Sequence, residues 1–138
     1  MRKLNQKCLY RIIDANYNRL KEGLRVCEDI CRFIYDEKSL TRSFKAIRHE
    51  VSEIIAHLKF KNLIVSRNSE RDIGKETIVS ELKRDNLGDI FYANLQRTKE
   101  SIRVLEELTK LFDKTLAKRL KNMRYSIYGL EKKAVKKI

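Results

Sequence analysis

One polar pattern occurs twice in this chain, and its residue types are those that handle phosphate. The stretch ANYNRLKEGLRVCED, residues 15–29, is echoed 78 positions later by ANLQRTKESIRVLEE, residues 93–107. A guanidinium group binds phosphate through two parallel hydrogen bonds, and side chains three or four residues apart share one face of a helix. The shared polar side chains are Asn16, Arg19, Glu22 and Arg25, answered by Asn94, Arg97, Glu100 and Arg103. We therefore predict a phosphate-handling site rather than only a well-paired helix.

A polar segment between the two copies, SRNSERDIGKET, concentrates groups that could close over an anion. Among them are Arg67, Asp72 and Gly74. Its end, GKET, resembles a phosphate-binding P-loop only superficially, because no glycine stands five residues before Gly74 and Glu76 displaces Thr77. A loop that is merely polar and solvated is the alternative interpretation.

Three further polar residues lie together on a predicted second helix. Lys45 and Arg48 fall beside its apolar seam and could converge with Arg19 on an anion, because a polyphosphate site uses both guanidinium groups and the point charge of a lysine. His49 adjoins them. A lone histidine is more often a core or surface residue, and Tyr125 stands at the matching position of the second half.

Arg19 and Glu22 interrupt an otherwise apolar stripe. The stripe consists of Ile12, Ala15, Val26, Ile30 and Phe33. Partly buried charges are costly unless they are paired or ligated, and the amide of Asn16 beside the seam needs a partner from a ligand or a facing helix. For outward-facing charges such as Arg25 and Asp29 we favour ordinary surface ion pairs, which contribute only ~0.3–0.5 kcal/mol each.

The sequence lacks the motifs of covalent and hydrolytic catalysis. It contains no HExxH, GxSxG or GxGxxG, and no cysteine–histidine pair at a useful spacing. Phosphoryl transfer fits, because it depends on in-line positioning, Mg²⁺ and cationic stabilisation of spread charge. An acceptor that is itself a phosphate needs no general base, since its oxygen is already anionic.

Hydrophobic periodicity places these groups on long amphipathic helices. The first seam is expected at Ile13, Tyr17, Leu20, Leu24, Cys27, Cys31 and Ile34, then at Leu40, Phe44, Ile47 and Val51. The matching second seam is expected at Phe91, Leu95, Thr98, Ile102, Leu105, Thr109 and Phe112, then at Leu116, Leu120, Met123 and Ile127. We predict an all-α helical bundle of two duplicated helical hairpins, with about four long helices.

One helical domain is expected, with hairpins at about residues 4–59 and 89–137 and a polar connector at about 60–88. Ser39 and Asp113 are candidate N-caps, and Gly88 with Asp89 could open the helix before Phe91. In the connector, NLIVSR could form a short strand or extended piece, and ETIVSELKR a short extra helix. Helix connections in bundles usually run ~2–8 residues, so a connector of this length is often functional.

Composition narrows the class of partner. The 138 residues are 42% apolar, contain no proline and carry a net charge of +13, which favours phosphates, nucleotides, nucleic acid or a membrane surface. Lysine-rich bias on solvated helix faces is the alternative. Three cysteines without a signal peptide or long apolar run predict a reduced cytoplasmic protein that does not enter a membrane. Cys27 and Cys31 suit small core positions better than metal ligation.

Taken in combination, several segments resemble one known family. RIIDANYNRLKEGLRVCEDICRF, FKAIRHEV, SRNSERDIGKE and ANLQRTKESIRVLEEL are similar to the small hydroxymethylpyrimidine phosphate kinase of thiamin biosynthesis, which is often fused to thiamin phosphate synthase. The resemblance spans nearly the whole chain. It implies ATP- and Mg²⁺-dependent phosphorylation of 4-amino-5-hydroxymethyl-2-methylpyrimidine phosphate to the diphosphate, with little or no action on the unphosphorylated alcohol.

The resemblance also implies roles at the matching positions. The expected catalytic, phosphate-binding cations are Arg19, Lys45, Arg48, Arg67, Arg97 and Arg103. The expected substrate-binding residues are Asn16, Glu22, Arg25, Asp29, His49, Asn94 and Glu100, with Asp72 and Gly74 in the connector loop. The candidate Mg²⁺ ligands are Glu22, Asp72 and Glu100. Asp14, Gly23, Glu28 and Glu106 match as well, whereas Asn68, Arg71 and Ser101 depart from the family pattern.

Two other classes of function fit parts of the sequence. A basic helical module that binds nucleic acid or an acidic partner without catalysis would explain the net charge, but the chain has no RNP motif and no aromatic residues interleaved with its basic runs. A structural adaptor, or a homodimer that buries leftover seam, would explain the seams but not the charges set into them. Thiamin phosphate synthase itself is not expected, because the chain lacks the length and βα alternation of a TIM barrel.

Overall fold

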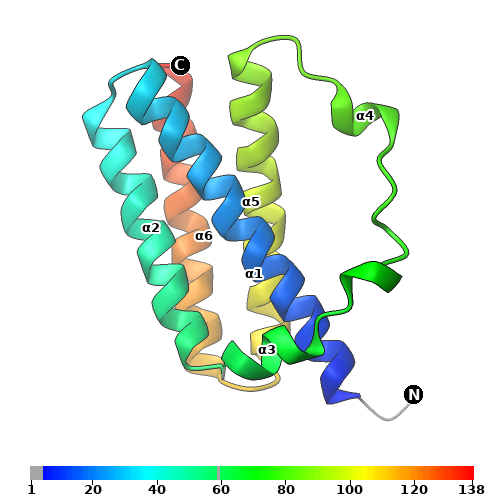
Figure 1. The fold of residues 1–138 in the computed structure, drawn as a ribbon. Helices are drawn as coiled ribbons and strands as arrows, with labels where there is room; N and C mark the ends of the chain where they lie inside the picture. The colour runs from blue at the N-terminus through cyan, green and yellow to red at the C-terminus, as the bar shows by residue number, and fades with distance from the viewer. Residues whose placement is uncertain (1–4, 59) are drawn as a thin grey trace.

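Four long helices form the body of the protein. A computed structural model describes residues 5–58 and 60–138 and contains α1 (Gln6–Asp29), α2 (Lys38–Ala56), α5 (Leu87–Thr109) and α6 (Lys114–Val135) (Figure 1). The shorter elements are the π-helix η1 (Ile30–Ile34), α3 (Phe60–Ser66), the 3-10 turn η2 (Ser69–Arg71) and α4 (Val79–Leu82). The described ranges contain no strand, so the all-α prediction is confirmed. The hairpin ends predicted at residues 4 and 59 lie outside the described residues.

The main contact between the first two long helices and the last two is that between α1 and α5. α1 also packs against α2 and α3, and α6 packs against α5 and α2. Figure 1 shows the chain between η2 and α4 running outside the bundle, from the end that holds the N-terminus to the end that holds the C-terminus. No helix in the described part is long and apolar enough to cross a bilayer.

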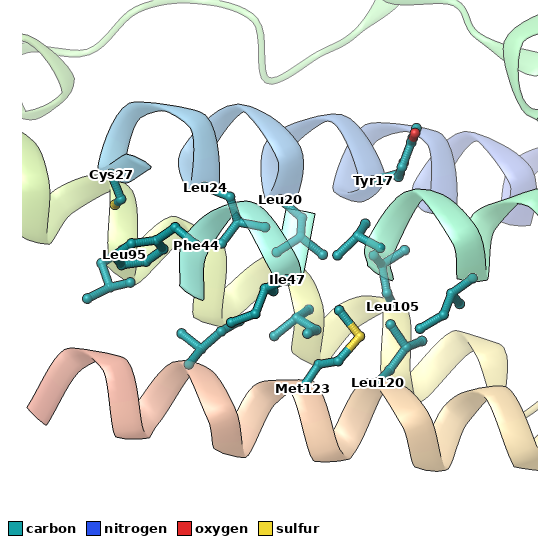
Figure 2. Packing of buried hydrophobic residues seen from close by; sticks show 14 of the residues in the cluster. Tyr17, Leu20, Leu24, Cys27, Phe44, Ile47, Leu95, Leu105, Leu120 and Met123 are labelled. Carbon is teal, nitrogen blue, oxygen red and sulfur yellow. The ribbon is translucent and has the colours of Figure 1, made fainter. Parts of the chain in front are cut away.

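The predicted apolar seams form the core. Figure 2 shows Leu20 and Leu24 of α1 on one side of the core and Leu120 and Met123 of α6 on the other, and Phe44 of α2 belongs to the same cluster. Two predicted seam residues are wrong: Ile34 is 53% exposed and Phe112 is 39% exposed. Ile34 lies in η1, where the wider i→i+5 turn rotates side chains away from α-helical spacing. Phe112 lies beyond the end of α5 and stacks on Tyr10, with ring centroids 6.2 Å apart.

The helix starts were predicted with mixed success. Asp113 is confirmed as an N-cap, because its carboxylate accepts hydrogen bonds from the backbone N–H groups of Thr115 and Leu116. Ser39 is not a cap, because α2 begins at Lys38 after Glu37. α5 begins earlier than expected, and the side chain of Asn86 accepts from the N–H of Asp89.

The connector differs from the prediction at its first element. NLIVSR is helical up to Ser66 in α3, not extended, and Leu63 and Ser66 are buried. The contact with α1 explains the difference, because a lone extended piece would leave its backbone groups unpaired. ETIVSELKR forms only the four-residue α4.

A glycine permits the close approach of α1 and α5. A Cβ atom on Gly23 would lie 2.5 Å from Thr98 Oγ1 and 2.9 Å from the carbonyl oxygen of Asn94. We expect Gly23→Ala to lower the free energy of unfolding, because overpacking typically costs ~1–3 kcal/mol and outweighs the helix-propensity gain of ~0.8–1.0 kcal/mol. Gly129→Ala on α6 is the matched control, since nothing lies within 4 Å of its Cβ, and we expect it to stabilise the protein. Urea unfolding of both variants measures the contrast, and a Gly23→Ala protein as stable as Gly129→Ala would contradict the expectation.

The three cysteines are expected to differ sharply in reactivity. Cys8 is exposed, whereas Cys27 and Cys31 are buried. Burial, followed by the charge of Glu37, raises the pKa of Cys31 to about 11, and burial also raises the pKa of Cys27. Because the thiolate is the reactive form, we expect a thiol reagent at neutral pH to label one cysteine in the native protein and three after unfolding. Rapid native labelling of Cys27 or Cys31, mapped by peptide mass spectrometry, would contradict this.

Candidate functional site

An ion pair ties the connector to α1. Arg67, just after α3, donates from Nε to Asp14 Oδ2 at 2.7 Å and from Nη2 to Asp14 Oδ1 at 2.8 Å. Asp14 is buried, and the side chain of Arg67 is 43% exposed. The hydrogen bonds that Arg67 donates to Asp14, and then the charge of Asp14, raise the pKa of Arg67, so the guanidinium stays charged. A guanidinium has five N–H donors, so Arg67 is held firmly while part of its fork remains available to a ligand.

Beside this ion pair, a pocket of about 430 Å³ opens between α1 and the start of the connector. We call it the connector pocket. It is lined on α1 by Cys8, Arg11, Ile12, Ala15, Asn16 and Arg19, and on the connector by Arg67, Asn68, Ser69 and Asp72. A volume in this range suits a small organic ligand.

The connector pocket carries an excess of positive charge. Arg11 and Arg19 make no ion pair with any described acid, and Arg67 is balanced only by Asp14. The one lining carboxylate, Asp72, accepts the backbone N–H of Gly74 at 2.9 Å through Oδ1 and so stabilises its own loop. Three guanidinium groups at one small cavity can bind a phosphate group from several sides.

The prediction that Arg19 and Glu22 are partly buried was wrong. Arg19 and Glu22 are both exposed, as are Arg97 and Glu100, because the supposed apolar stripe lies largely at the surface: Ile12 is 44% exposed and Phe33 is 65% exposed.

Asn16 also needs neither a ligand nor a facing helix to satisfy its amide nitrogen. Its Nδ2 donates to the carbonyl oxygen of Ile12 at 2.9 Å, and Asn94 Nδ2 donates to that of Ile90 at 2.8 Å.

Four of the predicted site residues meet in the connector pocket. They are Asn16, Arg19, Arg67 and Asp72. The expected convergence of Lys45 and Arg48 with Arg19 is not seen there. Arg48 instead donates to Glu28 from Nε at 3.0 Å and from Nη2 at 3.3 Å, while Lys45 and His49 are exposed on α2.

The other predicted residues lie elsewhere on the helices. Glu22 and Arg25 are exposed on α1, Asp29 is half-buried at its end, and Gly74 follows η2 without lining the pocket. Arg25 Nη1 lies 3.5 Å from Glu28 rather than pairing with Asp29.

On α5, Asn94 is half-buried and Arg97 is exposed. Glu100 and Arg103 line a shallow hollow of about 390 Å³ beside α6.

The described residues contain no ready-made metal centre. Across residues 5–58 and 60–138, no three His, Cys, Asp or Glu side chains lie close enough together to hold a metal ion. The candidate Mg²⁺ ligands Glu22, Asp72 and Glu100 lie on α1, the connector and α5. Only Asp72 lines the connector pocket, so a metal there would take ligands from a bound substrate as well.

Comparison with known proteins identifies the family. Residues 11–133 match the model of the ThiD2 family. The chain belongs to the ThiD2 family. No solved structure matches it significantly.

Curated relatives of this ThiD2-family chain are longer proteins named thiamine-phosphate synthase. The protein of Nostoc punctiforme is 39% identical over 127 residues, which is 91% of this chain and 35% of that protein. The proteins of Synechocystis sp. and Rhodopirellula baltica are each 35% identical, over 95% and 94% of this chain and 37% and 35% of their own lengths. The chain therefore spans about a third of the length of these relatives.

Arg11 and Cys8 line the connector pocket but are not among the site residues predicted from the sequence. Arg11, Ala15 and Arg19 are spaced four apart, so the shared helix face was readable. The second copy of the pattern has Asp89 at the position that corresponds to Arg11, so the repeat itself does not single out Arg11. The signal for Cys8 is weaker, since an isolated exposed cysteine has no spacing pattern.

Proposed function

We propose that this ThiD2-family chain is an ATP-dependent kinase that phosphorylates 4-amino-5-hydroxymethyl-2-methylpyrimidine phosphate to the diphosphate. The observation that carries the proposal is the connector pocket, where three arginines surround a cavity sized for a small phosphorylated molecule. The names of the relatives, thiamine-phosphate synthase, support a role in thiamin biosynthesis. This chain matches only about a third of each of those proteins. The part that matches can therefore catalyse a different reaction of thiamin biosynthesis from the one in the name.

The chemistry requires few catalytic groups. An oxygen of the acceptor phosphate attacks the γ-phosphorus of ATP, a new phosphorus–oxygen bond forms, and the bond to the β-phosphate oxygen breaks to release ADP. The attacking oxygen is already anionic, so no general base is needed. Arg11, Arg19 and Arg67 would hold the acceptor phosphate and offset charge in the transition state. Mg²⁺ would arrive with the nucleotide, bound mainly by its phosphate oxygens.

The same pocket would favour the pyrimidine phosphate over the free alcohol. An unphosphorylated substrate would leave three guanidinium groups without their anion and would lack the ready nucleophile. Discrimination against a substrate without the recognised group is strong when the polar groups of the site are left unpaired.

The deciding experiment incubates the purified protein with ATP, Mg²⁺ and the pyrimidine monophosphate. We expect ADP and the pyrimidine diphosphate to appear in equal amounts, and no product from the free alcohol. Absence of both products under conditions where the protein is folded would reject the proposal. Formation of thiamine phosphate instead would assign the step named for the relatives.

Cys8 provides a second readout that does not depend on turnover. Its thiol is exposed and lines the connector pocket, while the other two cysteines are buried. The pyrimidine monophosphate should slow alkylation of Cys8 at least ~10-fold when it is saturating, and the free alcohol should not, because the arginines bind the phosphate. Equal labelling rates with and without the monophosphate would place the substrate elsewhere.

A further inference from the structure

A second, strongly basic pocket lies between α5 and α6, near the turn that joins them. Its volume is about 570 Å³. We call it the α5–α6 pocket. Its cationic lining residues are Arg103, Lys110, Lys114, Lys118, Lys121 and Arg124. The remaining lining residues are Glu106, Ala117 and Tyr125, and none of the nine lines the connector pocket.

Among the described residues, the only acid that lines the α5–α6 pocket is Glu106, and it is already neutralised. Arg124 donates from Nε to Glu106 Oε2 at 2.7 Å and from Nη2 to Glu106 Oε1 at 3.3 Å, and its Nη1 donates to the hydroxyl of Tyr128 at 3.0 Å. Glu106 is buried, so an anion entering the pocket meets a rigid pair and not a free carboxylate. The pocket floor is therefore fixed, while the surrounding field stays positive.

Three lysines of α6 have no ion-pair partner among the described residues. Lys114, Lys118 and Lys121 are spaced four and three apart, so they form one stripe along the helix. Like charges at such spacing destabilise a helix by ~0.2–0.5 kcal/mol per pair. Nothing described in the protein relieves this repulsion, and a bound anion would.

The neighbouring carboxylate of Glu107 lies among the same positive charges. The pKa of Glu107, on the neighbouring turn of α5, is lowered first by its hydrogen bond from Lys110 and then by the charges of Lys110, Arg103 and Arg124. Lys110 Nζ lies 2.7 Å from Glu107 Oε1, and Arg103 Nε lies 3.4 Å from the same oxygen. Glu107 therefore pairs with two of the six cations, and the three lysines of the stripe have no acidic partner among the described residues.

The basic set is also repeated in the sequence, which argues against random lysine enrichment. Every cation of the α5–α6 pocket has a basic counterpart in the first half of the chain. Those of Arg103 and Lys110 stand 78 residues earlier and are Arg25 and Arg32. Those of Lys114, Lys118, Lys121 and Arg124 stand 76 residues earlier and are Lys38, Arg42, Lys45 and Arg48. Glu28 pairs with Arg48 just as Glu106 pairs with Arg124. A compositional bias alone would not repeat six positions and their buried acid.

The length of the lysine stripe indicates the class of ligand. Lys114 and Lys121 are seven residues apart, which is about 10 Å along a helix, longer than one phosphate group. Tyr125, 59% exposed, stands next along the same face. Arg124 Cζ lies 5.2 Å from the centroid of its ring, and aromatic rings of this kind are those on which nucleobases stack. We propose that the α5–α6 pocket is a second anion-binding site that takes a linear polyphosphate, such as the triphosphate of a nucleotide. The proposal goes beyond the kinase function and does not depend on it.

Calorimetric titration with inorganic tripolyphosphate at low ionic strength tests the site directly. We expect binding to the wild type and at least ~10-fold weaker binding to the variant Lys118→Ala/Lys121→Ala, because two of the three unpaired charges are gone. Lys132→Ala/Lys136→Ala is the matched control, with the same charge loss from exposed positions of α6 and its C-terminal end, and should change the affinity less than ~2-fold. Equal affinities of the two double variants would overturn the proposal.

Two further measurements separate the sources of the anion. If a nucleotide is the ligand, Tyr125→Ala should weaken the binding of a non-hydrolysable ATP analogue but not the binding of tripolyphosphate. If free polyphosphate is the ligand, Tyr125→Ala should weaken the binding of neither compound. Orthophosphate should bind much more weakly than tripolyphosphate. The polyphosphate assignment would be overturned if the wild type bound a DNA duplex in a salt-dependent way but did not bind tripolyphosphate, and if Lys118→Ala/Lys121→Ala lost the DNA binding. Because binding requires no turnover, these results are independent of the kinase assay.

Discussion

Replacing Glu106 by leucine is expected to lower the free energy of unfolding by about 3–5 kcal/mol, the usual penalty for leaving a buried charge without its partner. Arg124 and Glu106 are 8% and 4% exposed, and two hydrogen bonds join them across α5 and α6. The pairing raises the pKa of Arg124. An arginine keeps its proton even without such a partner, so the guanidinium cannot escape the penalty by becoming neutral once Glu106 is replaced. Denaturant unfolding followed by circular dichroism measures the loss.

Two controls separate the buried pair from ordinary surface charge. Glu107→Leu removes the adjacent carboxylate, whose partners are exposed, and should change stability little. The double variant Glu106→Leu/Arg124→Met should recover most of the lost stability, because no uncompensated charge remains. If Glu106→Leu and Glu107→Leu were equally stable, the buried pair would not have the structural role we assign to it.

Replacing Arg19 by alanine is expected to lower kcat/KM for the pyrimidine monophosphate at least ~10-fold, with helicity and stability unchanged. Arg19 is exposed, lines the connector pocket and has no acidic partner among the described residues, so its removal disturbs no packing. The lost group would contact charge that develops during phosphoryl transfer, and such contacts are worth several kcal/mol in a preorganised site. Steady-state kinetics with ATP saturating measures the effect.

The comparison with two other variants sharpens this test. Lys132→Ala removes one exposed, unpaired charge from α6 and should leave kcat/KM unchanged. The repeated pattern predicts an equal loss for Arg97→Ala, but Arg97 does not line the connector pocket, and we expect it to lose less than Arg19→Ala. Wild-type kinetics in Arg19→Ala would remove the connector pocket from the proposed mechanism.

The helices could be predicted because their signals are local. Leu20, Leu24, Phe44 and Leu95 follow a three–four spacing that any amphipathic helix shows, and all four are buried. Asp113 was readable as a cap because capping involves only the next three residues. The π-helix at Ile30–Ile34 was not predicted, since one residue inserted into a turn leaves the hydrophobic pattern nearly intact.

The sequence by itself determined the helical class, the two seams and the residue types suited to phosphate, because these depend on spacing along one chain. Only the tertiary structure decided which charges meet. Asp14 and Arg67 are 53 residues apart, and their pairing depends on α3 packing against α1. The same holds for exposure: Arg19 and Glu22 seemed to break a buried stripe, but the neighbours of α1 cover a different face. Periodicity shows that a helix has two faces, and only packing against other helices decides which one is buried and what a charged side chain can reach.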